Sequence, residues 1–308
     1  MNGSPDMSVT IGHMRMKNPV MPAAGTFGYG EEYAQFLDLN QLGAVIVKTI
    51  TQKPRIGSYP FRSTEVPSGL LATIGLQNVG IEKFINEKLP YFSGLDVPLI
   101  VNIGGLVLGD YIEVAEIIDR QYRVDGIEVN ISCPNLDRGG MHFGVDPRIT
   151  RELVYRIRQA TSKVLIIKLT PMVTDIRQLA EICQESGADA LSLINSPLGM
   201  AIDIKTRRSR LGRNITGGIA GPAIKPLALY LVWQVCRAVD IPVIGIGGIS
   251  STEDALEFII AGASAVQIGT WNFVNPGITV EVIKGIEAYM REQGIGKLSD
   301  LVGSFRTS

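Results

Sequence analysis

The chain has 308 residues, of which 45% are hydrophobic and 19% charged, a composition typical of a globular protein with a large core. Its 29 basic and 30 acidic residues leave a net charge of −1, which argues against binding to nucleic acid or to an anionic membrane surface. Three cysteines without a CxxC pair and two histidines argue against a disulfide framework and against a metal site. With no signal pattern at the N-terminus and no apolar run of membrane-spanning length, we expect a cytoplasmic protein.

Eight short apolar runs rich in β-branched residues follow one another along the chain, at residues 19–23, 44–49, 97–103, 126–132, 164–170, 190–196, 241–248 and 264–270. They are nearly continuous rather than alternating, as strands buried on both faces of a parallel sheet are. Segments with helical periodicity lie between them, at residues 111–122, 146–160, 175–188, 227–239 and 251–263. The alternation predicts a single (β/α)8 TIM barrel domain over residues 1–308. The competing architecture, a doubly wound open sheet, lacks its dinucleotide fingerprint after the first strand.

In such barrels the chemistry lies where the strands end. Here almost every run closes on a lysine, an amide, a hydroxyl or a glycine, which predicts a ligand site at that rim. The last two runs end in GIGGIS and IGTW, around Gly247, Gly248, Gly269 and Thr270. Glycines allow backbone amides to approach an anion closely, so these two ends predict a phosphate site, either for a phosphorylated substrate or for a cofactor such as FMN.

Lys48 and Lys168 each end an apolar strand, in IVKT and IIKLT. A lysine there either reaches solvent at the rim or serves the site. The functional alternatives are a Schiff-base nucleophile and a cation that faces an electron-rich ring. A flavin that accepts a hydride gains negative charge, which a lysine would stabilise.

Cys133 opens a loop shortly after Asn130, which ends a strand, whereas Cys183 and Cys236 fall inside helical patterns and are predicted to be core residues. Glycines at 139, 140 and 144 would let this loop move as a lid. Because no histidine is obviously placed to pair with the thiol, we interpret Cys133 as a general base rather than an acyl-transfer nucleophile. His142 is interpreted as a loop residue.

Over nearly its whole length the chain resembles the catalytic subunits of class 1B dihydroorotate dehydrogenases. The resemblance rests on segments such as MPAAGTFGYGEE, IGLQNVG, VNISCPN, GGMHFGVDP, KLTPMVTDI, LINSPLGMAIDIKT and PVIGIGGI. It implies an FMN-binding barrel that oxidises dihydroorotate to orotate in pyrimidine biosynthesis. It further implies that Cys133 removes the C5 proton while the C6 hydride passes to flavin N5, with Lys48 and Lys168 as the other catalytic residues.

The resemblance also assigns the two binding sets. FMN contacts would fall on Ala24, Lys48, Thr49, Asn102, Asn130, Lys168, Ile194, Gly221, Gly247, Gly248, Gly269 and Thr270. Substrate contacts would fall on Lys48, Ala72, Thr73, Ile74, Gly75, Leu76, Asn130, Asn135, Asn195 and Ser196. Ala72 departs from the family, which usually has an asparagine there, and the basic segment at residues 205–213 carries more charge than is typical.

The class implies a homodimeric core and a partner, an iron-sulfur flavoprotein subunit that carries FAD and a 2Fe-2S cluster and passes electrons to NAD. Three cysteines are too few for this chain to hold such a cluster itself. Three alternatives stay open: an FMN-dependent reductase or dehydrogenase of another pyrimidine or an enone, a lyase that uses Lys168 as a Schiff base, and a non-catalytic barrel subunit.

Overall fold

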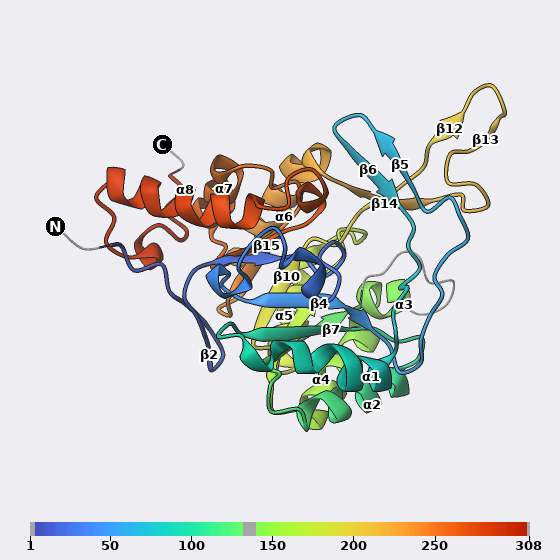
Figure 1. Ribbon diagram of the computed structural model, residues 1–308, viewed down its shortest axis with the longest axis horizontal. Coiled ribbons are helices and arrows are strands. Elements are labelled where there is room, and N and C mark those ends of the chain that lie inside the picture. The colour runs from blue at the N-terminus through green and yellow to red at the C-terminus, as the bar shows by residue number, and fades with distance from the viewer. Residues whose placement is uncertain (1–3, 132–139, 307–308) are drawn as a thin grey trace.

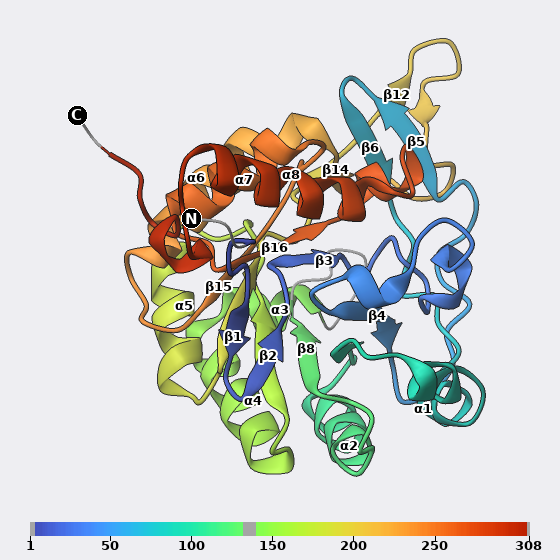
Figure 2. The ribbon, with the colours of Figure 1, turned by 60° about the vertical axis from the view of Figure 1, so that its left-hand side comes forward.

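The computed structural model describes residues 4–131 and 140–306, with the backbone alone at residues 140–142. Across this part of the chain, eight parallel strands curl into a barrel (Figure 1 and Figure 2). In the order of the sheet they are β3 (Val20–Pro22), β16 (Ala265–Ile268), β15 (Val243–Ile246), β10 (Ala190–Leu193), β9 (Val164–Lys168), β8 (Gly126–Asn130), β7 (Leu99–Ile103) and β4 (Val45–Ile50). The Gly43 amide donates to the Val20 carbonyl at 2.9 Å, so the two end strands of the sheet meet. The predicted (β/α)8 barrel is confirmed.

The strands form where the sequence is apolar because both of their faces are covered. Every residue of β7, β8 and β9 is buried, with one face toward the barrel interior and the other toward the surrounding helices. Seven of these strands fall within the predicted runs, and β4 extends one residue past its run, to Ile50. Since all of them are parallel, their carboxyl ends meet at one rim, which brings residues far apart in sequence into a single site.

The helices pack around the sheet: α1 (Ile81–Lys83), α2 (Leu108–Asp119), α3 (Gly140–Val145), α4 (Pro147–Ala160), α5 (Ile176–Glu185), α6 (Lys225–Cys236), α7 (Thr252–Ala261) and α8 (Ile278–Glu292). Asp175 and Ser251 cap α5 and α7, since each side chain accepts a hydrogen bond from a backbone amide of the first turn. Gly262 ends α7 at φ 124°. Among the helices described, none combines the length and the apolarity that crossing a bilayer requires.

Two additions to the barrel were not predicted. A hairpin of β1 (Val9–Ile11) and β2 (Met14–Met16) lies at the end opposite the strand carboxyl termini, where Gly12 packs against Val164 and Asp189. At the other end an arm projects from the molecule (Figure 1), built from β5 (Ser63–Val66), β6 (Gly69–Ala72), β11 (Leu198–Gly199), β12 (Ile202–Asp203), β13 (Arg208–Ser209) and β14 (Gly217–Ala220). The basic segment at residues 205–213 includes the exposed turn between β12 and β13.

Candidate active site

A cavity of about 610 Å³ opens at the carboxyl ends of the strands. Each barrel strand contributes to its lining, either through its last residues or through the residues that follow it. The arm forms the far wall, with Ser63, Leu70, Ala72, Gly218 and Ala220. The cavity therefore lies between the barrel mouth and the arm, which explains why its residues come from almost the full length of the chain.

One wall of the cavity is made of backbone rather than side chains. Gly221, Gly247 and Gly248 line it with φ angles of 97°, 134° and 74°, a region that disfavours any residue with a Cβ. A Cβ on Gly247 would come within 2.5 Å of the Ala228 Cβ, and one on Gly248 within 2.8 Å of the Lys225 amide nitrogen. Such a wall lets an anionic group approach main-chain amides directly, as the sequence predicted for this rim.

Side chains of α6 and α7 hold the loop after Gly248 in place. The carboxylate of Asp254 accepts hydrogen bonds from the Ser250 amide and hydroxyl, both at 2.8 Å, and from Lys225 Nζ at 2.6 Å. Lys225 also donates to Glu257 at 2.9 Å. Burial lowers the pKa of Lys225, but these hydrogen bonds outweigh it, so that the pKa is raised overall. The Lys225 ammonium is thus engaged by two carboxylates.

The floor of the cavity carries a buried polar cluster. Lys168 and Asn102 line the cavity, and both are joined to Glu128, which is fully buried in the middle of β8. Asn102 Nδ2 donates to Glu128 Oε1 at 2.6 Å, and Lys168 Nζ lies 3.6 Å from the same oxygen. The Oδ1 atom of Asn102 is buried and has no hydrogen-bond partner among the described residues. It is therefore an acceptor available to a ligand.

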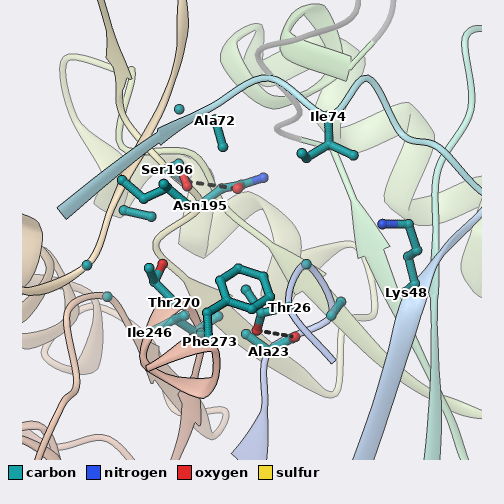
Figure 3. Close-up of a pocket in the computed structure, with 18 of the residues that line it drawn as sticks. Ala23, Thr26, Lys48, Ala72, Ile74, Asn195, Ser196, Ile246, Thr270 and Phe273 are labelled. Carbon is teal, nitrogen blue, oxygen red and sulfur yellow. Dashed lines mark hydrogen bonds between the residues drawn. The ribbon is translucent and has the colours of Figure 1, made fainter. Parts of the chain in front are cut away.

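Lys48 reaches the cavity from β4. In Figure 3 its side chain points into the space between two groups of lining residues, with Ala72, Asn195 and Ser196 in one and Ala23, Thr26 and Phe273 in the other. Burial lowers the pKa of Lys48, an effect that Glu32 opposes and Arg62 reinforces. A cation that is partly removed from water interacts more strongly with a bound anion than an exposed one does.

The segment after β6 closes one side of the cavity. Ala72, Ile74, Gly75 and Leu76 line it, whereas Thr73 is buried outside the lining and its amide donates to the Arg62 carbonyl at 2.7 Å. Asn78 holds the segment in place: its Nδ2 donates to the Leu76 carbonyl at 2.8 Å, while its Oδ1 accepts from the Thr51 and Gly80 amides at 3.2 and 2.8 Å.

Asparagines from two strands meet on the cavity wall. Asn195 Nδ2 donates to Asn130 Oδ1 at 3.2 Å, and the Ser196 amide donates to Asn195 Oδ1 at 2.8 Å. The Tyr111 hydroxyl donates to the Asn130 carbonyl at 3.0 Å and so fixes the end of β8. These contacts orient amide groups toward the cavity, where they offer donors and acceptors to a heterocyclic ligand.

All of the residues predicted to contact FMN line this one cavity, as do the predicted substrate residues other than Thr73 and Asn135. Cys133, Asn135 and the side chain of His142 lie outside the described residues. Cys183 is buried in the core and Cys236 packs against it, and burial raises the pKa of each to about 12. Among the residues described, no cluster of His, Cys, Asp or Glu is suited to a metal ion.

Several further residues of this region were not predicted from the sequence. Thr26, Glu32, Tyr33, Trp271 and Phe273 line the cavity but lie in loops and short helical turns without a periodic signal. Ser63 belongs to the arm, whose strands were not predicted. Glu128 had a signal that was not used: a single carboxylate inside an otherwise apolar strand.

Comparison with known proteins agrees with this geometry. The family model described as dihydroorotate dehydrogenase matches residues 6–290. The chain is 52% identical over 302 residues to the dihydroorotate dehydrogenase B (NAD(+)) catalytic subunit of Geotalea daltonii, which covers 98% of this chain and 99% of that protein. It is 50% identical over 300 residues to the protein of the same name from Bacteroides fragilis, with 97% and 98% covered.

A solved structure with a similar fold carries the same family name. A crystal structure of DHODH from Eimeria tenella in complex with ferulenol superposes with a TM-score of 0.80 at 22% sequence identity, covering 97% of this chain and 88% of that one. At this identity the similarity concerns the barrel fold.

Proposed function

Because the chain belongs to the dihydroorotate dehydrogenase family, we propose that it oxidises dihydroorotate to orotate in pyrimidine biosynthesis. The family consists of flavin-dependent oxidoreductases, and the flavin that we propose here is FMN. The observation that carries the proposal is the convergence of the predicted cofactor and substrate residues on one cavity at the barrel mouth. In the reaction, dihydroorotate loses a proton from C5 and a hydride from C6, which leaves the C5–C6 double bond of orotate.

The described residues fit an FMN molecule. The wall formed by Gly221, Gly247 and Gly248 suits its phosphate because no side chain intervenes. The free Oδ1 of Asn102 suits a ring N–H donor. Lys168 and Lys48 supply positive charge on the cavity surface. The flavin, when bound, would accept the hydride from C6.

For the substrate, we propose that Lys48 faces the charged dihydroorotate and that Asn130, Asn195 and Ser196 hydrogen-bond its ring. Anion binding by Lys48 is supported by its partial burial, which strengthens its interaction with a carboxylate. The proposal assigns the general base that accepts the C5 proton to Cys133, on the family resemblance. Asn135 and the segment of residues 72–76 complete the proposed substrate set.

The relatives are named as the catalytic subunit of a NAD(+) enzyme, which implies a second subunit. We propose that this subunit is an iron-sulfur flavoprotein that carries FAD and a 2Fe-2S cluster, and that two copies of the present chain form the core of the complex. We place the protein in the cytoplasm on its cysteine usage. Reconstitution with that subunit should make dihydroorotate-dependent NAD reduction possible.

The primary test is optical. The purified protein should be yellow, and dihydroorotate added without oxygen should bleach the flavin absorbance. A colourless protein that cannot be reconstituted with FMN overturns the proposal. Bleaching by another dihydropyrimidine or by reduced enones, and not by dihydroorotate, would instead select the related reductase, which the small side chain of Ala72 in the cavity wall favours.

A Schiff-base lyase is disfavoured by the surroundings of Lys168. The nucleophile of such an enzyme is an uncharged amine, whereas Lys168 Nζ lies in an ion pair with Glu128, 3.6 Å from its carboxylate. Borohydride reduction in the presence of a carbonyl substrate distinguishes the two, because only the lyase would leave a covalent adduct on Lys168.

A further inference from the structure

Glu128 is placed in the barrel interior where an apolar residue would be expected. It is fully buried in β8, and its neighbours along the strand, Ile127 and Val129, are fully buried too. Its carboxylate accepts hydrogen bonds from Asn102 Nδ2 of β7 at 2.6 Å, Ser192 Oγ of β10 at 2.8 Å and Gln267 Nε2 of β16 at 2.7 Å. Lys168 Nζ of β9 forms an ion pair with it at 3.6 Å. A group that only accepts hydrogen bonds, surrounded by donors, is satisfied as the carboxylate.

Stability alone does not account for this arrangement. Removing a carboxylate and an ammonium from water costs several kcal/mol each in general, and apolar residues of similar size often stabilise a core as well or better. The four partners divide into two kinds: Asn102 and Lys168 line the cavity, whereas Ser192 and Gln267 lie outside its lining. Glu128 thus connects the two groups on the cavity floor to the barrel interior.

The consequence for Asn102 is a fixed amide orientation. Because Glu128 takes the Nδ2 end, the Oδ1 end is left as the acceptor, and it has no partner among the described residues. Without a carboxylate at that position the amide could turn over and present a donor to the cavity instead. Glu128 also forms an ion pair with Lys168, so that a negative charge beneath the cavity floor offsets the charge of the Lys168 ammonium.

We propose that Glu128 is a positioning residue that sets the reduction potential of the bound flavin, by orienting Asn102 and by offsetting the charge of Lys168. This inference rests on the proposed function, since it requires a flavin in the cavity. Reduction adds negative charge to the flavin, and an uncompensated lysine nearby favours that state. Glu128 therefore holds the potential below the value that Lys168 alone would give.

The test is the midpoint potential of the flavin bound to the purified protein, measured by anaerobic titration against a reference dye. Glu128→Gln removes the charge and nearly preserves the shape. It should favour the reduced flavin by about tenfold, equivalent to about +30 mV for a two-electron couple. Glu128→Asp, which keeps the charge, should stay within about threefold of the wild type. The matched control is Ser192→Ala, which removes a neutral donor from the same carboxylate and should leave the potential unchanged.

An unchanged potential in Glu128→Gln overturns the inference, as does a shift in Glu128→Asp as large as that in Glu128→Gln. If Glu128→Gln does not retain flavin, thermal unfolding of the double variant Glu128→Gln/Lys168→Met decides. Removing both partners leaves no unpaired buried charge, so the double variant should unfold at a higher temperature than Glu128→Gln. An unfolding temperature of the double variant equal to or below that of Glu128→Gln would mean that Glu128 does not offset the charge of Lys168, which overturns the inference.

Failure of the inference is distinguishable from failure of the proposed function. The proposed function fails if the wild-type protein binds no flavin or if dihydroorotate does not reduce it. The inference fails when the wild type is yellow and active but the potential does not depend on the charge at position 128.

Discussion

The two cavity lysines differ in how their charge is balanced. Lys168 is paired with Glu128 from below, whereas Lys48 has no carboxylate within ion-pair distance among the residues that the structure describes. Burial consequently dominates at Lys48 and lowers its pKa, because an ammonium loses hydration there without gaining a close partner. Lys48, which has no nearby carboxylate, is the lysine that we propose for the anionic substrate. Lys168, which is paired with Glu128, belongs to the proposed cofactor set.

The lowered pKa of Lys48 predicts an alkaline limit to substrate binding. As the pH rises, Lys48 loses its proton earlier than an ordinary lysine, whose pKa is about 10.4. The value of kcat/KM for dihydroorotate should therefore fall in the alkaline range through an increase in KM. In Lys48→Arg the guanidinium stays charged, so this fall should disappear even if the rate at neutral pH is lower.

The same shift has a consequence for folding with a definite sign. Between the lowered pKa of the folded state and the ordinary pKa of the unfolded state, the unfolded chain binds more protons at Lys48. The contribution of Lys48 to the free energy of unfolding therefore rises with pH across that window.

The kinetic prediction for Lys48 has a clear contrary outcome. A kcat/KM profile in Lys48→Arg with the same alkaline fall as the wild type would assign the fall to another group.

Cys133→Ser tests the proposed base. An alcohol is a much poorer base than a thiol at neutral pH, so flavin reduction by dihydroorotate should slow by about 10²–10⁴-fold. The measurement is anaerobic stopped-flow of flavin absorbance, in which binding is separated from reduction by varying the substrate concentration. In the wild type the reduction rate should rise with pH as the thiol titrates. A serine variant that reduces its flavin at the wild-type rate would remove Cys133 from the mechanism.

Ala72→Asn tests the cavity wall that the arm provides. Ala72 lies opposite Gly218 in the β6–β14 pairing, and Gly218 in turn lies against Ser196. Ala72 lines the cavity, so an amide there gains a position facing the ligand. We expect dihydroorotate and its product orotate to bind more tightly by about 1 kcal/mol, the usual contribution of one added hydrogen bond. The measurement is the dissociation constant of orotate from flavin spectral changes. Weaker binding would show that the corner formed with Ser196 is already filled by the substrate.

At the scale of elements, the barrel strands were predictable and the arm was not. Strands such as β7, β8 and β9 are apolar throughout because both faces are buried, and this gives a strong local signal. The arm strands are short, partly exposed and rich in glycine, as in Gly217–Ala220, and they are stable only through pairing with each other. Their signal is spread over segments more than 100 residues apart, so no local pattern shows it.

Gly248→Ala tests the backbone wall. Gly248 has φ 74°, and an added Cβ would lie 2.8 Å from the Lys225 backbone, which cannot move without shifting the start of α6. We expect a loss of about 1–3 kcal/mol from the strained backbone, divided between stability and flavin affinity. Fluorescence titration of the apoprotein with FMN measures the affinity, and thermal unfolding measures the stability.

Gly109→Ala is the matched control for that variant. Gly109 lies in the first turn of α2, outside the lining of the cavity, and a Cβ there would meet nothing within 4 Å. Alanine in a helix is favoured over glycine by about 0.5–1 kcal/mol, so this variant should be slightly more stable and should bind FMN as the wild type does. Equal flavin affinity in both glycine variants would remove Gly248 from the phosphate site.

At the scale of the whole molecule, the site exists only because the barrel closes. Residues as distant as Ala24 and Thr270 line the same cavity, and the residues at strand ends could be assigned to it as soon as the fold was predicted. The polar contacts beneath the cavity floor could not be predicted in the same way. The bonds from Glu128 to Ser192 and Gln267 cross the barrel interior, and they depend on side-chain directions that a linear pattern does not specify.

A ligand that contacts every strand end should stabilise the whole barrel, since it binds the folded chain alone. At a free FMN concentration of about 100 times its dissociation constant, the free energy of unfolding should rise by about 2.7 kcal/mol. For a domain of this size that corresponds to an increase in melting temperature of roughly 4 °C. The measurement is thermal unfolding of flavin-stripped and FMN-reconstituted protein, with riboflavin, which lacks the phosphate, as the comparison ligand. Because the glycine wall is proposed to hold the phosphate, riboflavin should stabilise the protein less. Equal melting temperatures with and without bound FMN would mean that the cofactor does not bridge the strand ends.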